Sequence, residues 1–119
     1  MQLGYTEQCA RIIGETLQLW VGSVRIYEIR ISELIWYSES YPWEFAMCDW
    51  KLLSQKETEN CIRFYYRSGS IEAEVLFCNA QKELRITTEF HNVGETKVSQ
   101  FTAGLTLPVT GYGKNKVTI

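Results

Sequence analysis

The stretch that decides the fold is "IRFYYRSGSIEAEVLFCNAQKELRITTEFH", residues 62–91. Apolar and polar side chains alternate along three successive runs within it, and residues typical of turns separate the runs. Since successive side chains of a strand point to opposite faces, each strand has one apolar and one polar face. We therefore expect an antiparallel meander with one buried face and one wet face. The side chains assigned to the buried face are Ile62, Phe64, Tyr66, Ile71, Ala73, Val75, Phe77, Leu84, Ile86, Thr88 and Phe90.

The register of the first hairpin depends on where its turn lies. A two-residue turn over residues 68–69 would place Tyr66 opposite Ile71. The same register would place Arg63 opposite Glu74 on the wet face, where oppositely charged pairs support strand pairing. Charges on that face are expected to be solvated, so each pair should contribute little stability. The other members of this face are Tyr65, Arg67, Glu72, Arg85, Thr87, Glu89 and His91.

The remaining runs complete an all-β chain. Residues 16–37 are rich in β-branched and aromatic side chains, which favour strands, and are interrupted at Gly22 and Ser23. Residues 6–14 predict a short helix capped by Thr6 and ended by Gly14, with a strand as the alternative. We expect an antiparallel β-sandwich because several strands follow one another at intervals of about ten residues.

The C-terminal runs cover residues 98–107 and 117–119. The first changes phase near Ser99 and Gln100, which predicts a bulge there, and then keeps alternate side chains on one face. An open sheet edge at the last run would invite a partner strand or a second copy of the chain. The alternate side chains in question are Phe101, Ala103, Leu105 and Leu107.

Composition limits the classes of protein. The chain has 119 residues, 45% of them hydrophobic, which is typical of one globular domain. Its 14 acidic and 12 basic residues are interspersed, so no block of positive charge predicts nucleic-acid binding. The sequence has neither a long apolar span nor a start typical of a signal peptide, so we expect a cytoplasmic protein without membrane association.

The cysteines do not predict a metal site. Cys9, Cys48, Cys61 and Cys78 include no C-x-x-C pair, and the chain has one histidine. Reduced thiols are the expected state in a chain without a signal peptide, and two disulfides are the alternative. No cofactor or metal is expected.

A dense aromatic segment, residues 36–50, supplies the candidate ligand contacts. Tyr41 and Trp43 flank a proline, and exposed aromatic rings can stack on the C–H faces of sugars while the nearby Glu44 binds hydroxyl groups. The candidate site adds Trp50, and Tyr65 from the wet face. The alternative is that Trp36, Phe45 and Trp50 fill the core. Glu39, Glu44 and Asp49 could also supply a glycosidase carboxylate pair, but nothing in the sequence fixes their separation.

The only histidine gives no support for catalysis. His91 falls at the polar end of its strand, directly before residues 92–95, which form a turn in which Gly94 can adopt positive φ. "GYGKNK", residues 111–116, lacks the spacing of a phosphate-binding loop and is interpreted as a connection. No catalytic residue is assigned.

Residues 49–108, a succession of hairpins leading to the F-x-N-x-G turn "FHNVG", resemble the galactose-mutarotase-like β-sandwich superfamily. That resemblance implies a sandwich fold and a role beside carbohydrate-active enzymes. Active epimerases of that superfamily use histidines and an acidic base, whereas "FTAGLTLPVTG", residues 101–111, has no histidine. The resemblance therefore implies a fragment, a half sandwich or a non-catalytic member. The same turn is similar to those of immunoglobulin-like adhesion modules.

Together these features predict a single domain over residues 1–119, which could be part of a larger sandwich. The leading functional expectation is a non-catalytic module that binds carbohydrate or accompanies a carbohydrate-active enzyme. The alternative is a small interaction or dimerisation module that uses an open sheet edge. A sugar epimerase or glycoside hydrolase is the least favoured hypothesis.

Overall fold

A computed structural model describes residues 2–4, 8–38, 49–80, 83–95, 102–105 and 114–118. These residues are mostly antiparallel strands with one short helix, which confirms the all-β fold class. The elements are β1 Gln2–Gly4, β2 Gln8–Ile13, β3 Thr16–Val21, β4 Val24–Arg30, α1 Ile31–Leu34, β5 Ile35–Ser38, β6 Lys51–Glu57, β7 Cys61–Ser68, β8 Ile71–Ala80, β9 Glu83–Asn92, β10 Thr102–Leu105 and β11 Lys114–Thr118.

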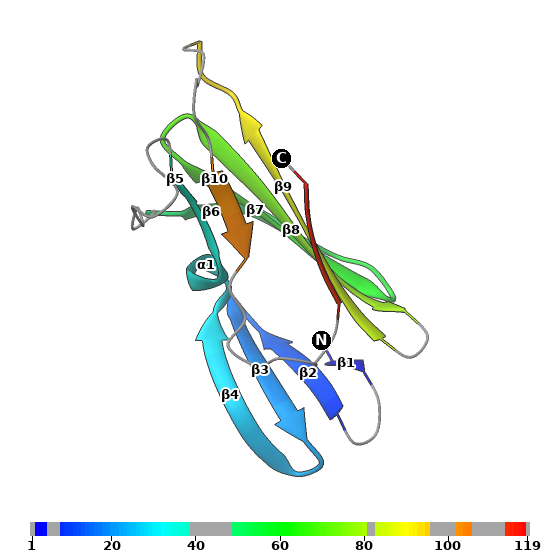
Figure 1. The fold of residues 1–119 in the computed structure, drawn as a ribbon. Coiled ribbons are helices and arrows are strands. Elements are labelled where there is room, and N and C mark those ends of the chain that lie inside the picture. The colour runs from blue at the N-terminus through cyan, green and yellow to red at the C-terminus, as the bar shows by residue number, and fades with distance from the viewer. Residues whose placement is uncertain are drawn as a thin grey trace.

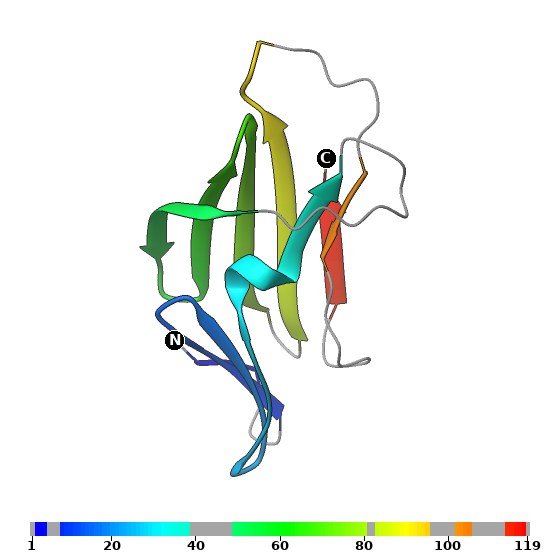
Figure 2. The ribbon, with the colours of Figure 1, turned by 90° about the vertical axis from the view of Figure 1, so that its left-hand side faces the viewer.

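The strands form three sheets (Figure 1). The largest has the order β11-β9-β8-β7-β6, the N-terminal one has the order β1-β2-β3-β4, and β5 pairs with β10. All described pairings are antiparallel except that of β11 with β9, which is parallel. The four-stranded sheet lies at one end of the five-stranded sheet, and β5 crosses in front of the latter in Figure 2.

The predicted N-terminal helix is wrong. Gln8–Ile13 is strand β2, and it pairs with β3 along its whole length. Ala10 and Ile12 are buried while Ile13 is exposed, which is the alternation of a strand. Gly14, expected to end a helix, instead has φ 59° in the turn between β2 and β3. The expected cap, Thr6, lies outside the described residues.

The described helix is the single turn α1 between β4 and β5. Its Ile31 and Leu34 are buried, so the turn contributes to the core. In the part of the chain that the structure describes, no helix is long and apolar enough to cross a membrane.

The central meander has the predicted faces but a different register. The turn comprises Gly69 and Ser70, so that Ser68 pairs with Ile71. Tyr66 consequently lies opposite Ala73 instead of Ile71. The predicted partners are therefore wrong, but the assignment of faces is right, since the shift preserves parity. Ten of the predicted inward residues are buried: Ile62, Phe64, Tyr66, Ile71, Ala73, Val75, Phe77, Ile86, Thr88 and Phe90. The side chain of Leu84 is not among those described.

Buried side chains from all three sheets and α1 belong to one hydrophobic cluster. Ala103 and Leu105 of β10 pack against it, as their alternation predicted. A polar link joins distant parts of the chain, because the Tyr66 hydroxyl donates to Glu15 Oε1 at 3.2 Å. Closure of these sheets into a complete sandwich stays a prediction. The predicted bulge near Ser99 lies outside the described residues.

Candidate binding surface on the five-stranded sheet

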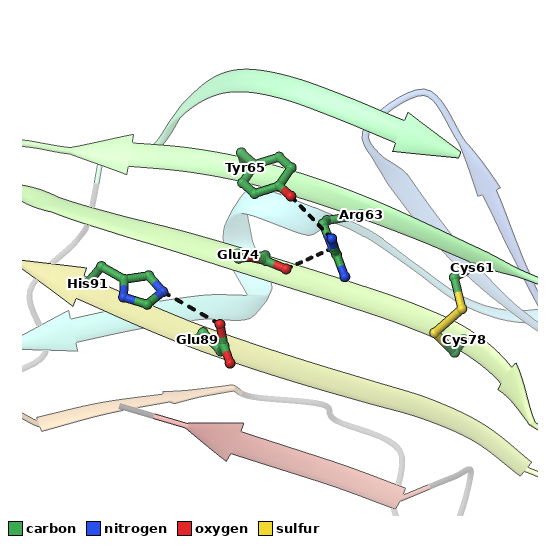
Figure 3. A network of polar contacts seen from close by, with 7 residues as sticks. All are labelled: Cys61, Arg63, Tyr65, Glu74, Cys78, Glu89 and His91. Carbon is green, nitrogen blue, oxygen red and sulfur yellow. Dashed lines mark hydrogen bonds and ion pairs between the residues drawn. A yellow bond between two sulfur atoms is a disulfide. The ribbon is translucent and has the colours of Figure 1, made fainter. Parts of the chain in front are cut away.

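The polar face of the five-stranded sheet is the face turned away from the core, and it carries Arg63, Tyr65, Glu74, Glu89 and His91 (Figure 3). Alternate residues of β7, β8 and β9 are buried in the core. The residues between them therefore point to the opposite face of the sheet, where they lie together. Tyr65 of β7 lies opposite Glu74 of β8, which in turn lies opposite Glu89 of β9. The face therefore presents an aromatic ring beside two carboxylates.

Arg63 is the centre of this network. Its Nε lies 2.7 Å from Glu74 Oε1 as an ion pair that is not aligned as a hydrogen bond, and its Nη1 donates to the Tyr65 hydroxyl at 3.4 Å. Because Arg63 lies directly opposite Leu76, its contact with Glu74 is diagonal. The predicted pair thus forms without the predicted register. The guanidinium positions the phenol of Tyr65.

The electrostatics keep Arg63 charged. The hydrogen bond with Tyr65 raises the pKa of Arg63 most strongly, and the charge of Glu74 raises the pKa further, while partial burial lowers it. Since Arg63 is 39% exposed and Glu74 is 22% exposed, water screens the ion pair. We therefore assign the pair a contribution of less than about 1 kcal/mol to the free energy of unfolding.

His91 is on the polar face at the end of β9, as predicted. It is 58% exposed, and its Nε2 lies 3.5 Å from Glu89 Oε2. In the following turn, Asn92 Oδ1 accepts a hydrogen bond from Gly94 N at 3.0 Å. The expectation of positive φ at Gly94 is wrong. Glycine is needed there because an added Cβ would lie 2.6 Å from Cβ of Ser70.

Two pockets lie along β6 and β7. The first, about 350 Å³, is lined by Asp49, Lys51, Leu53, Arg67, Ser68 and Gly69. The second, about 210 Å³, is lined by Lys56, Thr58, Cys61, Arg63 and Leu76. Neither pocket is an enclosed cavity, so both suit chemical groups of a ligand that lies along the surface.

A disulfide joins Cys61 and Cys78, which contradicts the expectation that all four cysteines are reduced. The two residues lie directly opposite each other on β7 and β8, with Cα atoms 4.2 Å apart. The register assumed from the sequence would have placed Cys61 opposite Leu76, so the pairing was not recognised. Cys9 is buried and free. Cys48 lies outside the described residues.

The predicted contacts divide into three groups. Tyr65 is partly exposed on the polar face. Tyr41, Trp43 and Glu44 lie outside the described residues. Trp50 is only 8% exposed, and its Nε1 donates to the carbonyl of Ile35 at 3.0 Å. Its ring fills the core, so the structure favours the core interpretation of Trp50 over the ligand contact.

Sequence reasoning missed a cluster on the four-stranded sheet. The Arg11 guanidinium stacks 4.4 Å from the ring centre of Trp20, a cation–π contact. Gln18 Oε1 accepts from Trp20 Nε1 at 3.1 Å, and Gln18 Nε2 donates to Glu28 Oε1 at 3.1 Å. Gln18 and Trp20 are two residues apart on β3, so they share one face of the strand. This spacing was the signal available in the sequence. Gln18 and Trp20 therefore contact each other as well as Glu28 of β4 and Arg11 of β2. These mutual contacts favour a structural role for the cluster.

Among the described residues, no group of three or more His, Cys, Asp or Glu side chains could hold a metal ion. No protein-family model, no curated protein and no solved structure matches this chain.

Proposed function

We propose that this protein is a non-catalytic module that binds carbohydrate on the polar face of its five-stranded sheet. The observation that supports this proposal is that the Arg63 guanidinium contacts both the Tyr65 hydroxyl and the Glu74 carboxylate, so that an aromatic ring, a cation and a carboxylate lie together on one face. An aromatic ring offers a surface to the C–H face of a sugar. Guanidinium donors and carboxylate acceptors can bind the surrounding hydroxyl groups.

The exposure of the carboxylates favours binding over catalysis. A glycosidase acid depends on an apolar environment that keeps it protonated near neutral pH. Glu74 and Glu89 are 22% and 43% exposed, so both are open to water. Carboxylates in contact with water are suited to accept hydrogen bonds from sugar hydroxyls.

A glycan array followed by calorimetric titration tests this proposal. We expect saturable binding to at least one glycan, with the affinity reduced about tenfold in Tyr65→Ala through loss of the stacking surface. Tyr65→Phe keeps the ring and serves as the matched control, and it should retain most of the affinity. Absence of binding at millimolar glycan would contradict the proposal. Loss of binding in Trp43→Ala but not in Tyr65→Ala would place the site on residues 36–50.

A second candidate function is strand addition at β6. This strand forms one edge of the five-stranded sheet, and all seven of its residues are exposed, including Leu53 at 53%. Its unpaired backbone groups could pair with another strand. However, two features of β6 oppose association at this edge: the lysines Lys51 and Lys56, and the irregular pairing between Leu52 and Ser54. Sedimentation velocity tests this candidate, which predicts a dimer that Leu53→Lys dissociates.

A further inference from the structure

We propose that the Cys61–Cys78 disulfide is a site of reversible thiol–disulfide exchange, and that a small thiol attacks it at Cys61 while the protein stays folded. The reacting ligand is a low-molecular-weight thiol, which forms a mixed disulfide with Cys61. Carbohydrate binding is not required for this reaction. Three features of the molecule support it, namely the exposure of the disulfide, the pocket beside Cys61 and the hydrogen bonds that hold the surrounding backbone.

The disulfide lies on the polar face of the five-stranded sheet, where both cysteines are only half-buried (Figure 3). Their neighbours Ile62 and Phe77 point to the other face and are buried in the core. Because Cys61 and Cys78 do not belong to the hydrophobic cluster, a thiol dissolved in water does not need to open the core to reach them. Exposed disulfides are those that exchange most readily.

The two sulfur atoms differ in their surroundings. Cys61 lines the smaller pocket, about 210 Å³, whereas Cys78 is not among the described residues that line it. The same pocket is lined by Lys56 of β6 and by Thr58, which follows β6. Since β6 and β8 flank β7 on opposite sides, this pocket gives access to Cys61 from the side away from Cys78. A thiolate attacks a disulfide in line with the sulfur that leaves, so this is the side from which attack on Cys61 must come.

The reaction consists of two exchanges. In the first, a thiolate attacks Cys61 Sγ and forms a new S–S bond, the bond to Cys78 breaks, and its electron pair leaves on Cys78 Sγ, which is then protonated. In the second, another thiolate attacks the small thiol's sulfur in the mixed disulfide, and Cys61 leaves and is protonated. Two small thiols are thereby oxidised to a disulfide, and their two electrons and two protons reduce Cys61 and Cys78. Attack by Cys78 on the mixed disulfide reverses the first exchange.

Hydrogen bonds that do not involve sulfur hold the backbone around the two cysteines. Thr58 N and Oγ1 both donate to the carbonyl of Cys61, at 2.8 and 3.2 Å, and Asn79 N donates to the carbonyl of Asn60 at 2.9 Å. The ladder of β7 and β8 continues from Cys61 and Cys78 to the turn. Reduction breaks none of these bonds, so the two thiols should stay opposite each other. The disulfide can then close again by an intramolecular reaction.

Reduced glutathione, a tripeptide thiol, serves as the probe for the parent chain. After incubation under native conditions, the remaining thiols are blocked with N-ethylmaleimide in mild acid and tryptic peptides are analysed by mass spectrometry. Trypsin separates the two cysteines because it cleaves after Arg63 and Arg67. We expect the peptide with Cys61 to carry glutathione about tenfold more often than the peptide with Cys78. The circular dichroism spectrum should remain that of a β-sheet, and oxidised glutathione should restore the disulfide.

Thr58→Phe tests the pocket as the route to Cys61. The larger side chain should obstruct the pocket and slow the formation of the mixed disulfide about tenfold. Thr58→Ser keeps the hydroxyl and leaves the pocket open, so this matched control should react at the parent rate. Circular dichroism verifies that both variants fold, and labelling of the parent chain tests the proposal without them.

Several outcomes would overturn this proposal. Equal labelling of the two cysteines would indicate attack on an unfolded chain, and preferential labelling of Cys78 would assign the attack to the other sulfur. Loss of the β-sheet spectrum on reduction would contradict exchange within the folded protein. A disulfide that resists millimolar glutathione would exclude the reaction. A folded Thr58→Phe variant that reacts at the parent rate would exclude the pocket as the route.

Discussion

At the scale of single residues, two buried polar groups have opposite consequences for stability. The Tyr66 hydroxyl has a partner in Glu15, 51 positions away in the sequence. Thr88 is fully buried, and its Oγ1 has no hydrogen-bond partner among the described residues. A satisfied buried group supports the fold, whereas an unsatisfied one carries a desolvation cost.

Tyr66 should make stability depend on alkaline pH. Burial raises the pKa of its hydroxyl, and the charge of Glu15 and the hydrogen bond to it raise the pKa further. The folded state therefore retains this proton above pH 10, roughly where an unfolded tyrosine ionises. The free energy of unfolding should be unaffected by this group below that pH and fall as pH rises above it. Denaturant titrations at several pH values between neutrality and strong alkali would measure this.

The control for this prediction is Tyr66→Phe. Loss of the hydrogen bond should lower the free energy of unfolding by about 1 kcal/mol at neutral pH. The variant should also show a shallower alkaline decline than the parent chain. Parallel declines in the two proteins would contradict the assignment to Tyr66.

Thr88→Val should stabilise the protein. The two side chains have nearly the same shape, and valine removes a hydroxyl that is buried without a partner. We expect the free energy of unfolding to rise by about 1 kcal/mol. Thermal unfolding followed by circular dichroism would show a higher midpoint. A lower midpoint would mean that the hydroxyl has a hydrogen-bond partner.

At the scale of elements, a glycine and a tryptophan fit together across β5 and β10. Gly104 pairs with Trp36, and a Cβ at Gly104 would lie 2.7 Å from Cζ2 of the indole. Gly104→Ala should therefore displace the ring and lower the free energy of unfolding by roughly 1–3 kcal/mol. Combining it with Trp36→Phe should recover part of this loss, because the smaller ring relieves the contact. Additive losses in the double variant would contradict a direct clash.

In the β7–β8 hairpin, the two faces of the strands could be predicted from the sequence, but the cross-strand register could not. Alternation correctly assigned the two faces, because parity does not depend on which residues form the turn. The segment Ser68-Gly69-Ser70 allows glycine to occupy either position of a two-residue turn. In the structure Gly69, with φ 60°, occupies the first position. This choice sets every cross-strand partner, so the Arg63–Glu74 contact was predicted from the wrong register and the disulfide was missed.

The prediction of an N-terminal helix was wrong for a different reason. The segment from Gln8 to Ile13 is short, and the spacing of its apolar residues is compatible with either a helix or a strand. Pairing with β3 decides between them, because it completes the hydrogen bonds of the backbone over six residue pairs. Such tertiary pairing is not visible in a local pattern.

At the scale of the whole molecule, the pairing of strands β6 and β7 was not predicted. Alternation identified Tyr65 as a surface residue, but no local pattern indicated that Lys51 and Lys56 would lie opposite Arg67 and Arg63. Residues 51–57 were not recognised as a strand, since both faces of β6 are exposed and its sequence lacks alternation. The pairing of β6 with β7 creates the Lys–Arg pairs and both pockets. The main features of the candidate site are therefore tertiary.

The disulfide should contribute to global stability. It closes a loop with a sequence separation of 17 residues, which restricts the unfolded chain. We expect Cys61→Ser/Cys78→Ser to lower the free energy of unfolding by about 3 kcal/mol. Denaturant unfolding of the parent chain with and without reductant provides the control, because reductant should not affect the double variant. Equal stability of the reduced and oxidised parent would contradict this prediction.

The same bond also makes β7, its turn and β8 a closed covalent loop. A protease that cuts the exposed turn at Gly69 would therefore open the backbone without releasing a fragment. The nicked protein should migrate as one species on a non-reducing gel and as two pieces after reduction. Arg63, Tyr65 and Arg67 would remain covalently attached to the rest of the sheet. The polar face should therefore keep its residues after cleavage of the backbone at Gly69.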